Sequence, residues 1–497
     1  MTTKTLLASL ALATALTGWS ASPLMAQDPR DDFDWLDRMN RASAVMLADQ
    51  GVITPEQAKT IADTIEQVYA LSSEPGFSRS GYHLGLEPLM IEIGGVDISR
   101  LHTGRSTIDM GRSGLRLRER DLLLSTYEQL INTRQALLDY AAKYPNAIVP
   151  GYTLGVQAQP ISLGHYLTAY AGAFERHADY IEQTYDVVNY SPMGSAAMGT
   201  SSYPIDRQQL SDLLGFTAPI RNSFDSVHLA TLESAMHIVG VTSAIAMTSS
   251  QLSSDLENQF RMVKPWFTFP YDLDGGSSIM PQKQNPGGVN STRTGASDVV
   301  GIGAAYMFDS IKSASGDTDM IGEEPIEALT ATTGVLKRIE DMFEVFEFHE
   351  DRALDVVLGD YATATELANT LQREANIPFR EAHHIAALVV NFGRTNDLRP
   401  IDITYEDFKA VYAEAAEELQ LPAELALGEE SFLAALKPQN MVEKSQGFGG
   451  PQSSEVASMI EEMNSTVASD KAWLEQQQSA LAEADAKLDE AFAALLK

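Results

Sequence analysis

The segment from Gly275 to Pro286 carries side chains suited to removing a proton from carbon; it reads Gly-Gly-Ser-Ser-Ile-Met-Pro-Gln-Lys-Gln-Asn-Pro. Its glycines and its two prolines predict a loop, because proline prevents a helix from continuing. A serine with a lowered pKa can take a proton from the carbon beside a carboxylate. A lysine and an asparagine can then stabilise the charge that develops on that carboxylate. These residue types indicate either a catalytic loop for elimination or an ordinary polar surface loop.

Long helices must position this loop. Apolar periodicity and boundary residues predict helices over 114–144, 161–189 and 223–259, and the first of these ends before Pro145. The central part of the third helix carries a single charged residue, Glu233, and its apolar residues lie almost all round the helix. Such a helix is either buried or spans a membrane. Its serines, threonines and two histidines favour burial inside an oligomer over contact with lipid.

Composition excludes several classes of protein. The 497 residues include 68 acidic and 35 basic ones, for a formal net charge of -33. A nucleic-acid partner is not expected, because phosphate contacts need a basic surface. The absence of cysteine excludes disulfides, thiolate metal sites and cysteine nucleophiles. The 9 histidines show no metal-ligand spacing, so we expect neither a metal site nor a cofactor.

The first residues have the pattern of an export signal. Lys4 gives a positive start, an apolar run extends over 6–19, and Leu24-Met25-Ala26 resembles a cleavage site. The run is too short to span a membrane. We therefore expect a signal peptide over 1–26 and a mature protein in a bacterial periplasm or outside the cell.

The loop also resembles a family signature. Gly-Ser-Ser-x-Met-Pro-x-Lys-x-Asn-Pro, from Gly276 to Pro286, is similar to that of the fumarase, aspartase and argininosuccinate lyase superfamily, and every fixed position is present. The resemblance implies an all-α, three-domain fold and a homotetramer in which long helices form a twenty-helix core. It implies an N-terminal domain over 27–110, a central helical domain over 111–357 with the catalytic loop at 275–290, and a C-terminal domain over 358–465. Leucines that recur at a heptad spacing predict a helical tail over 466–497.

The resemblance also implies roles for individual residues. Ser277 would act as the base, while Lys283 and Asn285 would hold the aci-carboxylate. His102-Thr-Gly-Arg-Ser106 and the segment 149–160 are similar to further signature regions of argininosuccinate lyases. In that family each active site takes regions from three subunits, so we expect monomers to be inactive. The expected substrate contacts are His102, Ser106, Thr153, Ser201, Ser202, Ser278 and Arg293.

Several positions depart from the argininosuccinate lyase pattern. Leu154 stands where the family has a histidine, and Asn290 stands where it has the glutamate that pairs with that histidine. The joint change is chemically consistent, because a glutamate facing a leucine would be a buried, unpaired charge. Three contacts to the arginine-like part of the substrate are replaced by Ser315, Met320 and Glu323.

These residues predict an exported lyase that catalyses β-elimination from a small carboxylate-bearing substrate other than argininosuccinate, with fumarate as a candidate product. The leaving group would need little protonation, or His102 or Tyr152 would assist it. The open alternatives are a carboxymuconate-type cycloisomerase, an enzyme acting on a non-succinyl acid, and a catalytically silent relative with a binding or structural role. The presence of Ser277, Lys283 and Asn285 together argues against the catalytically silent alternative. No membrane partner is expected.

Overall fold

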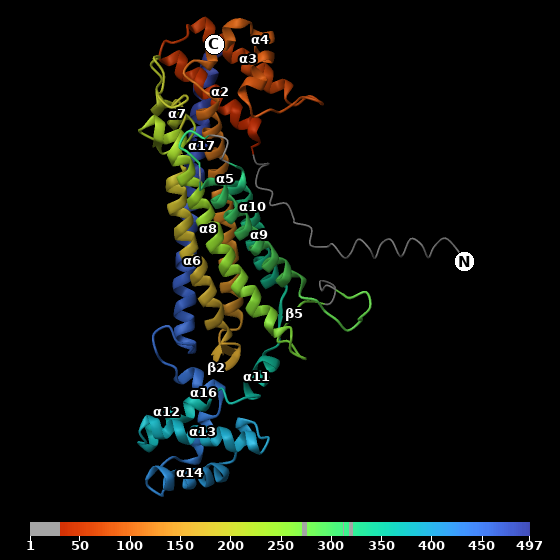
Figure 1. The fold of residues 1–497 in the computed structure, drawn as a ribbon, viewed down its shortest axis with the longest axis vertical. Coiled ribbons are helices and arrows are strands. Elements are labelled where there is room, and N and C mark those ends of the chain that lie inside the picture. The colour runs from red at the N-terminus through yellow and green to blue at the C-terminus, as the bar shows by residue number, and fades with distance from the viewer. Residues whose placement is uncertain (1–29, 271–275, 312, 318–321) are drawn as a thin grey trace, which may run out of the picture.

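The computed structural model describes residues 30–270, 276–311, 313–317 and 322–497, and its fold is all-α (Figure 1). The expected signal peptide and Met320 lie outside the described residues. Strands in the described part form three two-stranded ribbons. They pair β1 (Ile148–Thr153) with β2 (Val156–Ser162), β3 (Tyr190–Ser191) with β4 (Ala218–Pro219), and β5 (Phe267–Thr268) with β6 (Glu347–Phe348). The predicted fold class is confirmed.

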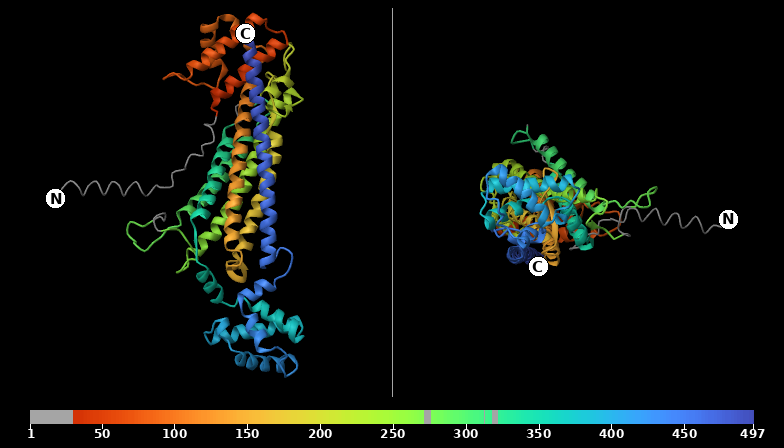
Figure 2. Two further views of the ribbon diagram at one scale, coloured as in Figure 1. Left: turned by 180° about the vertical axis from the view of Figure 1, so that it is seen from behind. Right: turned by 90° about the horizontal axis from the view of Figure 1, so that it is seen from below.

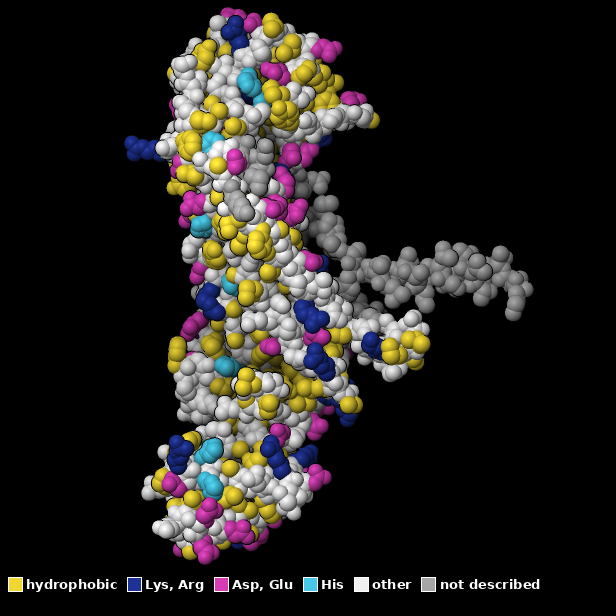
Figure 3. Space-filling model, viewed as in Figure 1, with side chains coloured by type: hydrophobic (Ala, Val, Ile, Leu, Met, Phe, Trp, Pro, Cys, Tyr) yellow, Lys and Arg dark blue, Asp and Glu magenta, His cyan; other side chains and the backbone are white. Residues whose placement is uncertain are grey.

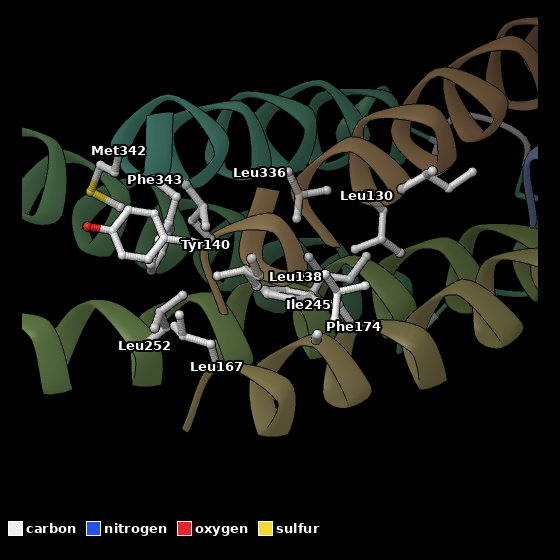
Figure 4. Close-up of a cluster of buried hydrophobic side chains, with 14 of the residues drawn as sticks. Leu130, Leu138, Tyr140, Leu167, Phe174, Ile245, Leu252, Leu336, Met342 and Phe343 are labelled. Atoms are coloured by element: carbon white, nitrogen blue, oxygen red, sulfur yellow. The ribbon is translucent and has the colours of Figure 1, made fainter. Parts of the chain in front are cut away.

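Long helices form the central bundle and run side by side in both ribbon views (Figures 1 and 2). Large apolar side chains from several of them meet in one core, including Leu138, Phe174, Ile245 and Leu336 (Figure 4). The bundle helices are α5 (Thr107–Lys143), α6 (Leu163–Val188), α8 (Ser223–Gln259), α9 (Gly287–Ser310), α10 (Glu324–Val345) and α17 (Ser453–Leu495).

Capping residues set where the first bundle helix begins. The Ser106 side chain accepts a hydrogen bond from the Ile108 N–H, and the Asp109 carboxylate accepts one from the Ser106 N–H, which completes a capping box. α5 therefore begins at Thr107, seven residues earlier than apolar periodicity predicts. This places the Ser106 hydroxyl at the N-terminal end of a 37-residue helix.

A second core closes one end of the bundle. It includes Leu36 and Ile61 from the first helices, and Leu488 and Phe492 from the end of α17. α17 is continuous from Ser453, so the domain boundary expected after residue 465 falls inside it. The other elements at this end are α2 (Asp32–Asp49), α3 (Pro55–Leu71), α4 (His83–Gly94), η2 (Val96–His102) and α7 (Arg207–Leu213).

A third group of short helices lies at the opposite end of the molecule (Figure 1). Its own core includes Leu371, Phe408 and Phe432. The chain then returns along the whole bundle as α17. This group comprises α11 (Glu350–Leu358), α12 (Ala364–Ala375), α13 (Phe379–Thr395), η4 (Pro400–Asp402), α14 (Tyr405–Leu419), α15 (Glu429–Ala435) and α16 (Pro438–Lys444).

Apolar side chains also lie on the outside of the bundle (Figure 3). Leu229 and Met247 of α8, and Phe308 of α9, are between 52% and 77% exposed in the single chain. Within the described residues, α8 is the one helix long and apolar enough to cross a membrane, and half of its apolar window is buried in the protein. The partial burial agrees with a core helix whose remaining face lacks a cover in one chain.

Candidate active site

The loop that carries the predicted catalytic residues projects from the side of the bundle between α8 and α9 (Figures 1 and 2). The Ser277 Oγ accepts hydrogen bonds from the N–H groups of Ile279 and Met280, at 3.4 and 3.1 Å. Both bonds favour the alkoxide form of Ser277, because they place donors on the oxygen that would carry the charge. Lys283 and Ser278 are exposed, and Asn285 lies half-buried where the loop enters α9.

The root of this loop is fixed in the bundle. The buried Gln259 side chain donates to the Phe267 carbonyl at 3.2 Å and accepts from the Phe267 N–H at 3.1 Å. Thr268 then hydrogen-bonds the His349 ring at 2.8 Å. Sequence reasoning missed Gln259, although a lone glutamine at the end of an apolar helix was an available signal. The loop therefore has a fixed base and an exposed tip.

A buried carboxylate joins two of the predicted site regions. Asp109 has no exposed surface, and its oxygens accept hydrogen bonds from the N–H groups of Ser106, Gly194 and Ala196 at 2.7, 3.0 and 3.0 Å. Burial raises the pKa of Asp109 to about 6, and these N–H groups oppose that rise. Asp109 was not among the predicted site residues. Its position holds Ser106 against the segment that follows β3.

Gly104 allows the same two regions to approach closely. It has a φ of +73°, and a Cβ there would lie 2.5 Å from the Ile205 side chain and 3.7 Å from the Ser201 Cβ. Only glycine meets both conditions without strain. Ser201 is half-buried and Ser202 is exposed. The structure thus brings Ser106, Ser201 and Ser202 to one end of the bundle.

His102 lies in a packed histidine pair beside this region. Its ring stacks on His83, with the ring centroids 5.0 Å apart. Burial lowers the pKa of both histidines, to about 4 for His83, and the nearby Arg105 charge acts in the same direction. Arg105 donates to the Asn40 side chain at 2.8 Å. The half-buried His102 ring therefore packs against His83, a partner that sequence reasoning missed.

Thr153 lies near the tip of the β1–β2 hairpin. Leu154 and Gly155 form the turn with φ values of 53° and 77°, as a tight hairpin turn requires. Leu154 is 103% exposed, and Tyr152 and Thr153 are exposed as well. A leucine in the left-handed region without any packing contact is strained, and such strain is typical of functional segments.

One chain does not bring the predicted residues into one site. Ser106 and the hairpin of Thr153 lie at opposite ends of α5, whose 37 residues span about 55 Å. The Ser277 loop lies at the start of α9, whose 24 residues span roughly 36 Å. Arg293 pairs with Glu257 of α8. A site containing Ser106, Thr153 and Ser277 together requires more than one chain.

The chain matches two family models: "Lyase" over residues 32–301, and "Argininosuccinate lyase C-terminal" over 361–443. It is 31% identical over 450 residues to the argininosuccinate lyase of Methanoculleus marisnigri, covering 89% of each chain. It is 31% identical over 432 residues to that of Methanocaldococcus jannaschii, covering 84% of this chain and 85% of the other. This chain belongs to the fumarase/aspartase superfamily, as an argininosuccinate lyase-like member. It is a lyase.

Solved structures agree with the assignment of this lyase. EDDS lyase in complex with formate superimposes with a TM-score of 0.86 at 26% identity, covering 94% of this chain and 92% of the other. A variant of EDDS lyase with bound fumarate gives 0.84 at 26% identity, covering 95% and 97%. The 3-carboxy-cis,cis-muconate lactonizing enzyme of Pseudomonas putida, at 17% identity and a TM-score of 0.65, covers 88% and 96% and shares the fold.

Charged residues compensate one departure of this lyase from its relatives. Glu323, at a position where the resemblance to argininosuccinate lyases implies a lysine, pairs with Arg118 of α5 at 2.6 Å, and Arg118 also approaches Asp32 at 3.2 Å. The reversed charge at 323 is therefore neutralised within the chain. Within the described segments, no group of three or more histidine and acidic side chains could hold a metal ion.

Proposed function

We propose that this lyase eliminates a leaving group β to a carboxylate, with Ser277 as the base. The Ser277 alkoxide takes the proton from the carbon beside the carboxylate, and the electron pair moves into that carboxylate. Lys283 and Asn285 stabilise the resulting dianion. Its collapse forms the C=C bond and expels the leaving group with the bonding electrons. The intact loop carries this proposal, because it holds a hydrogen-bonded hydroxyl, a cation and an amide within nine residues.

Fumarate is the product that we propose, and argininosuccinate is not the substrate. The structural neighbour with bound fumarate supports the product. Leu154 and Asn290 replace the histidine and glutamate of the argininosuccinate lyases, and Ser315 and Glu323 replace two of their contacts to the arginine-like part. Incubation with argininosuccinate should therefore release no fumarate. Release at a rate typical of the relatives would contradict the proposed specificity.

We also propose an exported homotetramer with shared sites. The separation of Ser106, Thr153 and Ser277 along the bundle supports sharing, and the exposed apolar face of α8 and α9 supports association. Export rests on the signal-like pattern of residues 1–26.

Replacing the base tests the proposal directly. Ser277→Ala should lower turnover at least about a hundredfold, because general-base catalysis contributes that much or more. Its circular dichroism and melting temperature should match those of the wild type, because Ser277 lies on a projecting loop. Ser297→Ala, on an exposed turn of α9, is the matched control and should retain activity. A near-normal rate for Ser277→Ala would contradict the assignment.

A carboxymuconate-type cycloisomerase is the second candidate, and Leu154 is the observation that favours it. Cyclising members of the superfamily resemble this chain in lacking the histidine at that position. Loss of ultraviolet absorbance from 3-carboxy-cis,cis-muconate would identify that activity. Appearance of new C=C absorbance from amine, ether or thioether adducts of dicarboxylates would identify the lyase. Neither signal across such a panel would favour a silent binding or structural relative.

A further inference from the structure

A small pocket lies at the end of the bundle where α5 and α8 begin and α9 ends. Its volume is about 100 Å³. An apolar cavity of roughly 150 Å³ holds a benzene molecule, so this pocket can hold one carboxylate-sized group. Arg112 of α5, His228 of α8, and Ser310 and Ser313 at the end of α9 line it.

The pocket wall presents polar atoms that lack a protein partner among the described residues. They are the His228 Nε2 and the hydroxyl oxygen of Ser313. His228 is 7% exposed, and its ring packs against Phe224 with the centroids 4.7 Å apart. A buried polar atom without a hydrogen bond destabilises the folded protein. Two such atoms on residues that line one pocket indicate a polar ligand or ordered water.

The charge of the lining favours one negative group. The Arg112 guanidinium lies in the wall, and its five N–H donors allow it to bind a ligand as well as protein groups. The imidazole and the two hydroxyls add further donors. Asp317 also lines the pocket; it is exposed, and its carboxylate accepts from the Ala314 N–H at 2.8 Å. Its charge disfavours a dianion, which leaves a single carboxylate as the matching group.

We propose that this pocket binds a carboxylate carried by the leaving group of the substrate. Arg112 lies six residues beyond Ser106, which is about 9 Å along α5. A substrate held at Ser106 can therefore reach the pocket. The inference rests on the proposed elimination, and it names the substrate class as dicarboxylate adducts of amines that bear one carboxylate. Ser315 also lines the pocket, at a position where the resemblance to argininosuccinate lyases implies the larger side chain of tyrosine.

Two amines of similar length test this pocket without turnover. β-Alanine carries a carboxylate, whereas propylamine ends in a methyl group. Ligand-observed NMR on Ser277→Ala protein, with fumarate present, should show β-alanine binding about tenfold or more tighter than propylamine. His228→Phe and Arg112→Gln should remove most of this preference. Arg399→Gln, an exposed arginine of the C-terminal group, is the control and should preserve it.

Substitution of Arg112 or His228 can disrupt folding, because both side chains are buried. A variant at a less buried position separates loss of binding from loss of folding. Ser313→Ala removes one hydroxyl at a half-buried position and should weaken β-alanine binding several-fold. Equal binding of the two amines, or an unchanged preference in all three pocket variants, would overturn the proposal. Preferential binding in a protein that never releases fumarate would contradict the proposed reaction and leave the pocket assignment standing.

Discussion

At the residue scale, a single carboxylate connects parts of the chain that lie 85 residues apart. The Asp109 carboxylate accepts hydrogen bonds from the N–H groups of Ser106, Gly194 and Ala196. It therefore connects the two predicted serine regions. Because the carboxylate accepts on both oxygens, an amide of the same shape cannot replace it. The side-chain NH2 group of asparagine would face one of these backbone N–H donors, and two donors cannot hydrogen-bond each other.

Asp109→Asn should therefore destabilise the protein by roughly 2–3 kcal/mol, because at least one buried donor loses its acceptor. It should also lower activity, since Ser106 and Ser201 would no longer be held together. Urea denaturation and turnover measure the two effects. Asp206→Asn is the control: Asp206 caps α7, and asparagine caps equally well. Equal stabilities for the two variants would exclude the linking role of Asp109.

His83 gives the fold a pH dependence at the same scale. Burial, with the Arg105 and His102 charges, lowers its pKa to about 4 from 6.5. Between these values the unfolded chain binds a proton that the folded chain does not, so stability is present above pH 6.5 and falls as pH falls. The unfolding free energy should drop by roughly 2 kcal/mol more in wild type than in His83→Phe between pH 7 and pH 5. Parallel pH profiles of the two proteins would contradict this sign.

At the element scale, α17 runs along the bundle and contacts both its long helices and the core of the N-terminal helices. Arg134 of α5, which has no exposed surface, pairs with Asp470 of α17 and with Glu175 of α6, the latter at 2.8 Å. Beyond this cluster, Leu488 and Phe492 enter the core of the N-terminal helices. A helix from the C-terminal part of the chain thus holds the end that carries Ser106.

Removing the charge that pairs with Arg134 should weaken the attachment of α17 to α5 and lower the free energy of unfolding. Asp470→Asn should cost about 3 kcal/mol, because it leaves a buried guanidinium undercompensated. Asp489→Asn, at a position 61% exposed beside Arg38, should change stability by less than about 1 kcal/mol. Urea unfolding of both variants makes the comparison. Similar losses in the two would show that α17 is not held through the buried pair.

Local signals in the sequence predict some features of single residues and of single helices. The Pro145 break and the loop composition act over a few residues, so the end of α5 and the catalytic loop follow from short segments. The Asp109 contacts, the His83–His102 stack and the pocket of Arg112 join residues far apart in the chain. No local pattern specifies them, because they depend on how the helices pack.

At the scale of the whole molecule, helix length separates the predicted catalytic groups. About 36 Å of α9 and 55 Å of α5 lie between them in one chain, and the apolar sides of α8 and α9 are uncovered. Both features agree with sites assembled where protomers meet. The strongly acidic composition also requires local positive groups, such as Lys283, to hold a carboxylate substrate.

Mixed oligomers of two inactive variants test this central claim most directly. Ser277→Ala removes the proposed base, and Ser106→Gly removes a proposed substrate contact while keeping a residue that caps helices well. If each site takes these residues from different protomers, denaturing and refolding an equal mixture should restore about a quarter of wild-type turnover, since both intact residues meet at one site in four. If one protomer supplies both residues, no intact site can form. Turnover of the mixture that stays at the level of the separate variants would contradict the shared site.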